Sequence, residues 1–469
     1  MRFRRLLLSI ATLMTMHAHA QQAGFSDADA AKVDSVVAKM LRDKQAPGAV
    51  VAIVKDGAVV YRKAHGVADL RTQRPMSLQD RFEIGSLTKQ MTAAAVLQLA
   101  QAGKLSLDDT VGKYLPDYPA AAAVTIRQLL WQVSGLPDFA GTPAFAANAS
   151  SHPTDFKSLL DTVRALPLEF QPGERWRYSN TNYVLLGRIV ELTGGASFDT
   201  YLAHHVLAKA GMATAVTLDQ TAGKATGYTT DHKQVIPAAV FQNSWIGAAG
   251  NLVACIDDLI AWDRALWRQH LLPDEALAAM RTPPMLNDGS PGGYGYGLFI
   301  DHQDGRDRVW HGGGTLGFSS SNMIYPQEQL WLIALVNHED LSATVMTAAI
   351  YDALHGIAPD GRPAVGEQPD ITAKARLWLQ RVKQGELPAA EVAPDLLRTL
   401  EAHQRRRYKW LQTKVDVYGR PEAVVYAGST ARDGAALHRY RLRFGAQWLR
   451  FEIGLLPDGR LADLDIAAE

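Results

Sequence analysis

The sequence predicts an α+β protein: an antiparallel sheet flanked by helices, an inserted lobe that is mainly helical, and a small α+β domain at the C-terminal end. Strand patterns occur near the N-terminus and again over residues 294–337, whereas residues 122–280 carry mostly helical patterns. The early and late strands are therefore expected to share one sheet, with the helical stretch inserted between them. A proline- and glycine-rich stretch, residues 358–369, then precedes a second set of helix and strand patterns.

Capping and turn residues locate the elements of the first domain. Ser26 is a typical helix N-cap with acidic residues after it, and Gly103 is a typical helix stop. Asp56 and Gly57 lie between two apolar runs and match a type I′ hairpin turn. The predicted elements are, in chain order, helix 26–44, strands 50–54 and 58–62, helix 91–101, strands 294–300, 322–325 and 330–337, and helix 343–355.

The residues after the linker are expected to form a separate domain. Apolar residues alternate with arginines from Arg439 to Phe444, as in a half-buried strand. Arg405 to Arg407 are predicted to lie on a solvated helix face. The other elements predicted here are helices 372–384 and 394–409 and a strand over 449–455. The predicted boundaries are a signal peptide over 1–20, a main domain over 21–357, a linker over 358–371 and an accessory domain over 372–469.

The N-terminus has the three parts of a secretory signal peptide. Residues 1–5 contain three arginines, residues 6–16 form an apolar core, and residues 18–20 match an A-x-A cleavage site. The apolar core is too short to span a membrane comfortably, so no stable membrane anchor is expected. The predicted location is therefore the periplasm or the extracellular space.

Composition argues against several function classes. The 469 residues carry no net charge at pH 7, which gives no basic footprint for nucleic acid. The histidines form no His-Glu-x-x-His motif, and His204 and His205 are adjacent on a predicted helix, so neither a metal nor another cofactor is expected. Cys255, the single cysteine, lies in an apolar stretch and is expected to be buried.

Ser86 and Lys89 form the first chemical signal. They lie directly before a helical run and three residues apart, so the hydroxyl and the amine fall on one face of a helix start. A neutral lysine there can take the serine proton and make the hydroxyl a nucleophile. A Ser-x-x-Lys sequence by itself is weak evidence, because about one is expected by chance in a chain of ordinary composition.

Tyr178 and Asn180 form the second signal. They follow the turn at Pro172-Gly173, in a predicted extended loop where residues two apart point the same way, and a helix is expected after Asn182. A phenol near a lysine can relay a proton to a leaving group, and a carboxamide can bind a substrate amide as donor and acceptor. The alternative is a turn tyrosine that packs its ring beside a helix-capping asparagine.

The third signal is His311 followed by three glycines, within the predicted late strands. Glycines in a strand allow a ligand or another backbone to approach closely. A substrate laid along this edge would pair with the main chain and have His311 at its far end. The alternative is a glycine-rich hairpin with a surface histidine.

These three ordered elements resemble those of the serine β-lactamase and DD-peptidase superfamily, in the branch that holds class C β-lactamases, DD-carboxypeptidases, D-aminopeptidases and related esterases. Residues 129–137 and 247–253 also resemble the Ser-Gly-Leu and Ala-Gly-Gly segments of that branch. The resemblance implies a β-lactamase-like serine hydrolase domain over residues 21–357. It implies that Ser86 is the nucleophile, that Lys89 is the general base and that Tyr178 relays protons.

The same resemblance implies the residues that bind substrate. Asn180 would position the acyl group, and His311 would face the far end of the substrate. The backbone N–H groups of Ser86 and Gly314, the residue after Gly313, would form the oxyanion hole.

Two departures from the family pattern stand out. Class C β-lactamases carry Lys-Thr-Gly where this chain has His311-Gly312-Gly313. A mostly neutral histidine and a missing hydroxyl weaken the case for an efficient β-lactamase. Gln132 and Val133 stand where relatives often have His-Thr, and nothing in the sequence explains that change.

The predicted function is a serine hydrolase that forms an acyl-enzyme on Ser86 and acts on D-amino-acid peptides, short esters or, weakly, β-lactams. Its expected partners are small molecules or peptides, cell-wall fragments included, and loops 141–153 and 229–244 are expected to select among them. One alternative is a sensor that binds cell-wall fragments or β-lactams without turnover. An α/β-hydrolase is disfavoured because the chain contains no Gly-x-Ser-x-Gly elbow.

Overall fold

The structure is a computed structural model that describes residues 25–220, 222–303, 306–356, 367–397, 421, 423–432, 434–444 and 447–468. The predicted signal peptide, residues 405–407 and most of the predicted linker lie outside these residues.

The main body is built on a seven-stranded antiparallel sheet. Its strand order is β3-β2-β1-β12-β11-β10-β9, so the N-terminal hairpin pairs directly with a late strand. This arrangement confirms the predicted sheet shared by early and late strands. The strands are β1 (Gly48–Lys55), β2 (Ala58–Asp69), β3 (Arg74–Pro75), β9 (Phe299–Gln303), β10 (Arg306–Thr315), β11 (Phe318–Tyr325) and β12 (Leu330–Val336).

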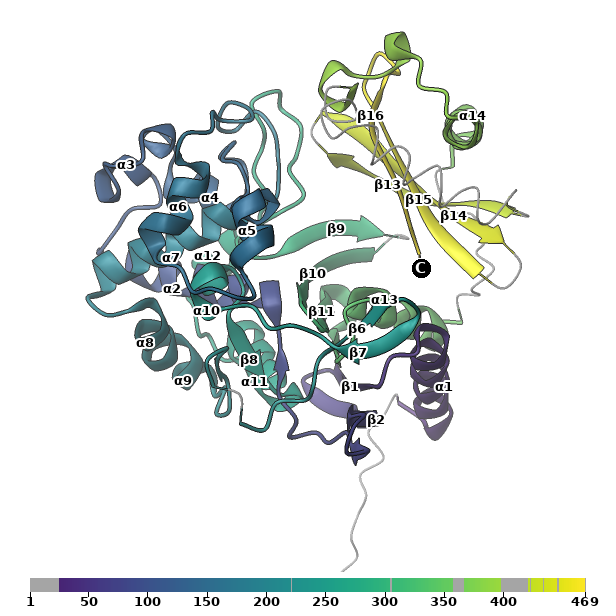
Figure 1. The fold of residues 1–469 in the computed structure, drawn as a ribbon, viewed down its shortest axis with the longest axis horizontal. Coiled ribbons are helices and arrows are strands. Elements are labelled where there is room, and N and C mark those ends of the chain that lie inside the picture. The colour runs from purple at the N-terminus through teal and green to yellow at the C-terminus, as the bar shows by residue number, and fades with distance from the viewer. Residues whose placement is uncertain are drawn as a thin grey trace, which may run out of the picture.

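Helices cover both faces of this sheet (Figure 1). On one face α1 (Asp27–Lys44) and α13 (Ala343–Leu354) share a core with alternate residues of β1, such as Val51. On the other face α2 (Thr88–Gln101) and α11 (Ile256–Trp267) share a core with the intervening residues of β1, such as Ala52. Because both faces are covered, β1 and β12 are apolar along almost their whole length.

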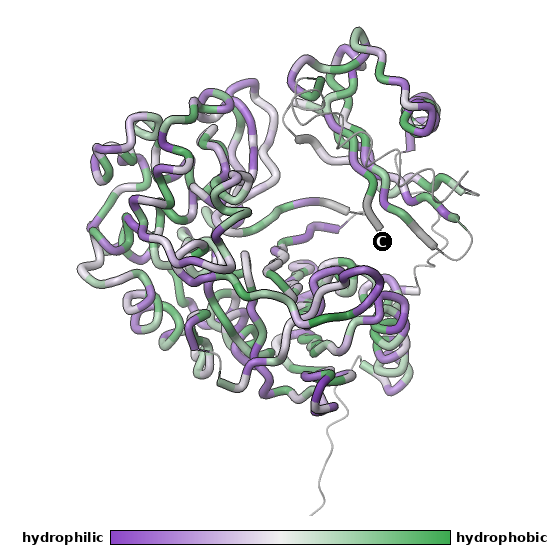
Figure 2. The backbone as a smooth tube through the Cα atoms, in the orientation of Figure 1, coloured by the Kyte–Doolittle hydropathy of each residue, from purple (hydrophilic) through white to green (hydrophobic). Residues whose placement is uncertain are grey.

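Local signals set the ends of these elements as predicted. Ser26 Oγ accepts from the Asp29 N–H at 3.2 Å and caps α1, whose tube in Figure 2 carries both hydrophobic and hydrophilic residues. Asp56 and Gly57 both have positive φ, at 52° and 83°, as a type I′ turn requires. Cys255 is buried, as expected, and precedes α11.

The inserted lobe is mainly helical, which confirms the prediction, but it also contains short strands that the sequence did not indicate. Strands of two to four residues are too short to show a period of two. They are β5 (Val216–Thr217), β6 (Tyr228–Asp231), β7 (Gln234–Pro237) and β8 (Leu252–Ala254). The helices are α3 (Val111–Tyr114), α4 (Ile126–Leu130), α5 (Pro143–Asn148), α6 (Phe156–Arg164), α7 (Asn180–Gly194), α8 (Phe198–Leu202), α9 (Ala208–Ala210), α10 (Asn243–Ile246) and α12 (Asp274–Met280).

The predicted strand 294–300 is corrected by the structure. The ladder begins only at Phe299, and Tyr294 makes a single bridge back to that residue. The glycines at 293, 295 and 297 give the segment before Phe299 a looped path, because Gly297 has a φ of +75°.

The C-terminal residues form a second antiparallel sheet with its own core, beside the outer end of β9 in Figure 1. Tyr440 and Leu442 are fully buried, as the predicted alternation requires. Its elements are α14 (Pro369–Gln384), β13 (Ala423–Arg432), β14 (Ala435–Phe444), β15 (Gln447–Leu455) and β16 (Leu461–Ala468). Residues 394–397 are helical, and the rest of that predicted helix lies outside the described residues.

The described part of the chain shows neither a membrane-spanning helix nor a metal-binding cluster. None of its helices combines the length and the apolar character needed to cross a bilayer. It also holds no group of three or more histidine, cysteine or carboxylate side chains arranged to bind a metal ion.

Candidate active site

The nucleophile segment enters the site through a tight turn. β4 (Phe82–Glu83) pairs with β8, and one 3₁₀ turn, Gly85–Leu87, then leads into α2. Gly85 has a φ of +50°, and a Cβ there would lie 2.8 Å from the Gly314 nitrogen, so the close approach of β10 requires glycine. Ser86 is partly exposed just before the α-helix begins, and belongs to the 3₁₀ turn.

Lys89 is fully buried one turn further on, with its amine beside the serine. Its Nζ lies 3.0 Å from Ser86 Oγ, 2.8 Å from Asn180 Oδ1 and 2.7 Å from the carbonyl oxygen of Ala249. Burial lowers the pKa of Lys89 to about 7, although the Asp138 carboxylate opposes the shift. A neutral amine has two N–H groups and one lone pair. Asn180 Oδ1 and the Ala249 oxygen can only accept, so the lone pair is left for the Ser86 hydroxyl.

Tyr178 comes from a different part of the chain and lies against the same amine. Lys89 Nζ is 4.8 Å from the centre of the Tyr178 ring. The Ser86 hydroxyl is near enough to lower the pKa of Tyr178, but the buried phenol oxygen makes no hydrogen bond of normal geometry within the described chain. Burial is the larger effect and raises the pKa of Tyr178 above its ordinary value of 10.0, so the phenol keeps its proton.

Asn180 is oriented by a residue that the sequence analysis missed. Asp138 Oδ1 accepts from the Asn180 backbone N–H at 3.0 Å, and Asp138 Oδ2 accepts from Asn180 Nδ2 at 3.1 Å. The carboxamide oxygen is thereby turned toward Lys89. Asn180 is also the first residue of α7, so this helix begins earlier than predicted and the extended segment ends at Ser179. Asp138 directly follows the Ser-Gly-Leu-Pro segment, and this position was the only available signal.

Gln132, unexplained in the sequence, has a clear structural role. It is fully buried, with φ +63°, and its Oε1 accepts from the Ser179 backbone N–H at 3.0 Å and from Asn182 Nδ2 at 2.5 Å. The Gln132 side-chain oxygen therefore holds Ser179, which links Tyr178 to Asn180, in a fixed position. Gln132 is a positioning residue, because its contacts fix the segment and not the reacting atoms.

His311 lies on β10 and is only 1% exposed, so the alternative of a surface histidine is wrong. Its Nδ1 lies 2.5 Å from the Gly312 carbonyl oxygen and donates to it, so Nε2 accepts from the Tyr294 hydroxyl at 2.9 Å. Burial, with repulsion from the Lys89 ammonium, lowers the pKa of His311 to about 3. The imidazole is therefore neutral and both of its nitrogens are engaged.

Gly313 and Gly314 face the site in different ways. A Cβ at Gly313 would lie 2.0 Å from the Ile84 carbonyl oxygen, so this glycine lets β10 pack against the nucleophile turn. Ser320 Oγ donates to the same Ile84 oxygen at 2.7 Å. Gly314 has open space where a Cβ would stand, and it lines a cavity together with Ser86.

That cavity, the Ser86 pocket, has a volume of about 210 Å³ and lies where the sheet meets the lobe. Ser86 and Gly314, whose N–H groups are the two proposed oxyanion donors, both line it. His311 is not among the residues that line it. The lining residues are Gly85, Ser86, Phe139, Ala140, Phe145, Asn180, Phe241, Ile246, Ala249, Gly250, Gly314 and Thr315.

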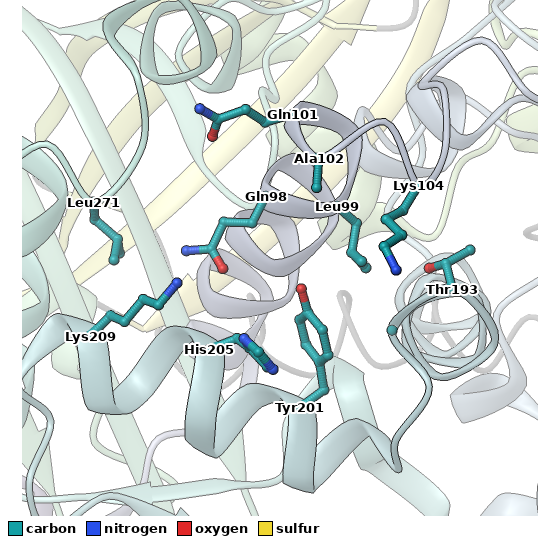
Figure 3. A pocket seen from close by; sticks show the side chains of 11 residues that line it. Gln98, Leu99, Gln101, Ala102, Lys104, Thr193, Tyr201, His205, Lys209 and Leu271 are labelled. Carbon is teal, nitrogen blue, oxygen red and sulfur yellow. The ribbon is translucent and has the colours of Figure 1, made fainter.

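A larger hollow of about 550 Å³ lies elsewhere and includes none of the predicted site residues (Figure 3). It borders the C-terminal end of α2, whereas Ser86 precedes the N-terminal end, and a helix of 14 residues spans about 21 Å. Lys104 and Lys209 line it together with residues from the C-terminal ends of α2 and α7, where the helix dipole favours positive charge. The chemistry therefore belongs to the smaller pocket.

Comparison with known proteins agrees with this geometry. A family model described as Beta-lactamase matches residues 33–356. The chain belongs to the Beta-lactamase family. It is 27% identical over 422 residues to a D-aminopeptidase of Brucella melitensis biotype 2, covering 88% of this chain and 78% of that protein.

Solved structures of Beta-lactamase family relatives share the fold. A D-stereospecific amidohydrolase from Streptomyces sp. matches with a TM-score of 0.60 and 26% identity, over 70% of this chain and 99% of that one. A penicillin binding protein from Bacillus halodurans matches with a TM-score of 0.59 and 27% identity, over 68% and 98% of the two chains. The predicted superfamily and fold class are confirmed, and the protein is a serine hydrolase of this family.

Proposed function

We propose that this Beta-lactamase family member hydrolyses D-amino-acid amides or peptides and short esters through an acyl-enzyme on Ser86. One observation carries the proposal: the buried Lys89 Nζ lies 3.0 Å from Ser86 Oγ and close to the Asn180 and Ala249 oxygens, which can only accept. When the amine is neutral, its two N–H groups go to those oxygens and its lone pair is left for the Ser86 hydroxyl. The relatives named D-aminopeptidase and D-stereospecific amidohydrolase support amides of D-amino acids as one substrate class.

In the proposed acylation, Ser86 Oγ bonds to the substrate carbonyl carbon while Lys89 takes the hydroxyl proton. The N–H groups of Ser86 and Gly314 stabilise the oxyanion, at about 3 kcal/mol of barrier for one donor. Tyr178 donates its proton to the departing amine or alkoxide and is reprotonated by the Lys89 ammonium. The bond between the carbonyl carbon and the leaving group breaks, and an ester on Ser86 remains.

Deacylation repeats these steps with water in place of the serine. Neutral Lys89, directly or through Tyr178, takes a proton from water as its oxygen bonds to the ester carbon. Ser86 Oγ then leaves and regains a proton. Asp138 and Gln132 act through Asn180 and Ser179 and are assigned positioning roles.

We expect β-lactams and other carboxylate-bearing substrates to react weakly. The Ser86 pocket is lined by no lysine, arginine or histidine, so no fixed cation meets a substrate carboxylate there. His311, which replaces the lysine of class C β-lactamases, is held neutral by burial. Its proposed contact with the far end of a substrate would therefore be uncharged.

The proposed location follows from the sequence. A cleaved signal peptide over residues 1–20 would deliver the enzyme to the periplasm or the extracellular space, where D-amino-acid peptides of the cell wall are accessible substrates. Precursor cleavage before Gln21, detected by N-terminal sequencing of the exported protein, tests this part of the proposal.

The deciding experiment compares Ser86→Ala with the parent on a p-nitrophenyl ester. Loss of the nucleophile is expected to lower kcat by at least about 10³-fold, as for other hydrolases of this kind. Mass spectrometry of the parent during turnover should find the acyl group on Ser86. Ser150→Ala, which changes an exposed serine of the lobe, is the matched control and should behave as the parent.

Two outcomes would contradict the proposal. Activity of Ser86→Ala within about tenfold of the parent would place the nucleophile elsewhere. A single burst of nitrophenol without steady release would identify a sensor that acylates once.

A further inference from the structure

Three aromatic rings and one aliphatic side chain form a wall of the Ser86 pocket. They are Phe139, Phe145, Phe241 and Ile246, all from the inserted lobe. The Phe145 ring centre lies 5.6 Å from that of Phe139 and 5.4 Å from that of Phe241. Phe139 begins a 3₁₀ turn, Phe145 lies in α5, Phe241 precedes α10, and Ile246 is the last residue of α10. Phe145 and Phe241 belong to the loops 141–153 and 229–244 that were expected to select the substrate, and the other two residues lie just outside them.

Hydrogen bonds fasten the two loops to each other. The Gln242 N–H donates to the Ala149 oxygen at 2.7 Å, and Trp245 Nε1 donates to the His152 oxygen at 2.7 Å. The Trp245 ring also packs on Phe145 at 5.8 Å. These contacts hold the apolar wall in place without a substrate. This pre-organisation limits the conformational entropy that the loops lose on binding.

The size and charge of the pocket restrict what it can hold. None of its lining residues is charged, so burial of a charged substituent would go uncompensated. The volume of about 210 Å³ exceeds the roughly 150 Å³ of an apolar protein cavity that binds benzene. A phenyl-sized apolar group fits this space.

Thr315 adds one polar group to this apolar pocket. It is only 8% exposed, it lines the pocket one residue after Gly314, and its Oγ1 has no hydrogen-bond partner among the described residues. A buried hydroxyl without a hydrogen bond costs free energy, so this group is available to bond a polar atom of a ligand. In β10 it directly follows Gly314, whose N–H is the second proposed oxyanion donor.

We propose that the Ser86 pocket receives an uncharged, phenyl-sized side chain of the acyl group, and that Thr315 Oγ1 hydrogen-bonds the polar substituent next to the reacting carbonyl. The proposal rests on the proposed function and names its substrate class: amides and esters of aromatic acyl groups, such as N-acylated aromatic amino acids. Phe139, Phe145, Phe241 and Ile246 are the specificity-determining residues.

The test uses three p-nitrophenyl esters with the same leaving group: acetate, 3-phenylpropionate and N-acetyl-D-phenylalanine. The parent is expected to show a kcat/KM for 3-phenylpropionate at least about tenfold above that for acetate, because a well-filled apolar pocket discriminates by this factor or more. Ile246→Trp fills the pocket and should lower that ratio about tenfold. Leu377→Trp makes a comparable change at an exposed position on α14, outside the substrate-selecting loops, and should leave the ratio unchanged.

Thr315→Val tests the hydroxyl alone, because valine keeps the shape of threonine. It should lower kcat/KM for the N-acetyl-D-phenylalanine ester about three- to tenfold, because the variant loses the free energy of one hydrogen bond to the substrate. The value for 3-phenylpropionate, which lacks the polar substituent, should fall by a smaller factor. Equal losses on both esters would overturn the assigned role of Thr315.

Failure of this proposal is distinguishable from failure of the proposed function. If the parent forms an adduct on Ser86 and turns over all three esters with similar kcat/KM, and Ile246→Trp shifts no ratio, the pocket does not select the acyl group and the nucleophile assignment stands. If no ester forms an adduct on Ser86, the proposed function fails first.

Discussion

At the scale of single residues, the decisive property is the charge state of three buried groups. Lys89 has its pKa lowered to about 7, whereas Tyr178 and His311 are both driven further into their neutral forms. One group can therefore exchange a proton near neutral pH while the other two keep a fixed state. This separation assigns the role of base to Lys89 and leaves Tyr178 as a proton donor and relay.

The pH dependence of the reaction follows from this assignment. Only neutral Lys89 has a lone pair, so kcat/KM for an uncharged ester should be low in acid and rise through a single limb with its midpoint near pH 7. His311, with a pKa of about 3, and Tyr178, with a pKa above 10.0, should add no limb between about pH 5 and pH 9.

The pH profile is measured with p-nitrophenyl acetate, with a correction for spontaneous hydrolysis. A profile that is flat over that range, or one whose only limb lies near the ordinary lysine value of 10.5, would remove Lys89 as the base.

At the scale of elements, the site depends on how closely β10 approaches the turn before α2. Ser320 Oγ bonds the Ile84 carbonyl oxygen, and the missing side chains of Gly85 and Gly313 leave room for that contact. The strand contributes Gly314 and Thr315 to the pocket, and the turn contributes Ser86. Two backbones in direct contact thus set the spacing between the nucleophile and the proposed oxyanion donors.

Gly313→Ala tests this contact, with Gly314→Ala as the matched control. A Cβ at Gly313 would stand 2.0 Å from the Ile84 oxygen and 2.3 Å from Ser320 Oγ, so β10 must move away from the turn. The expected cost in unfolding free energy is about 1–3 kcal/mol. At Gly314 no atom lies within 4 Å of the added carbon, so stability should stay at the parent value.

Urea denaturation of the two alanine variants and the parent gives the comparison, and kcat for p-nitrophenyl acetate should fall with Gly313→Ala because the oxyanion donors shift. Equal stability of all three proteins would show that the contact between β10 and the turn is loose.

At the scale of the whole molecule, a helical segment that precedes the C-terminal sheet contacts the segment that leads to Tyr178. Arg175 Nη1 lies 2.7 Å from Asp395 Oδ2, and Arg175 precedes Tyr178 by three positions in the chain. The C-terminal residues have a core separate from the two cores of the main body, with Trp378 and Phe451 among its buried residues. The predicted division into two domains agrees with these separate cores and stays a prediction.

A double-mutant cycle at Arg175 and Asp395 measures this contact. Both side chains are partly exposed, so the coupling free energy should be about 0.2–1 kcal/mol and should shrink at high salt. Urea midpoints of Arg175→Ala, Asp395→Ala and the double variant supply the cycle. Strict additivity of the two single changes at low salt would mean that the ion pair does not join the C-terminal residues to the main body in solution.

Sequence reasoning predicted elements correctly wherever their signal is local or strongly periodic. The capped helix at Ser26, the type I′ turn at Asp56-Gly57 and the alternation around Tyr440 were all predicted, because each depends on neighbours within a few positions. Short strands such as β8 were missed because three residues show no period, although β8 supports the segment before Ser86. The start of α7 was placed too late because Asn180 owes its position to Asp138, 42 residues away.

The fold class and the residue types of the reaction were predictable from the motifs and their order along the chain. What those residues can do depends on the folded structure. Burial supplies the lowered pKa of Lys89, and contacts across the chain supply the orientation of Asn180 and the fixed neutrality of His311. Charge state and orientation depend on desolvation and on partners far away in sequence, and these exist only once the chain has folded.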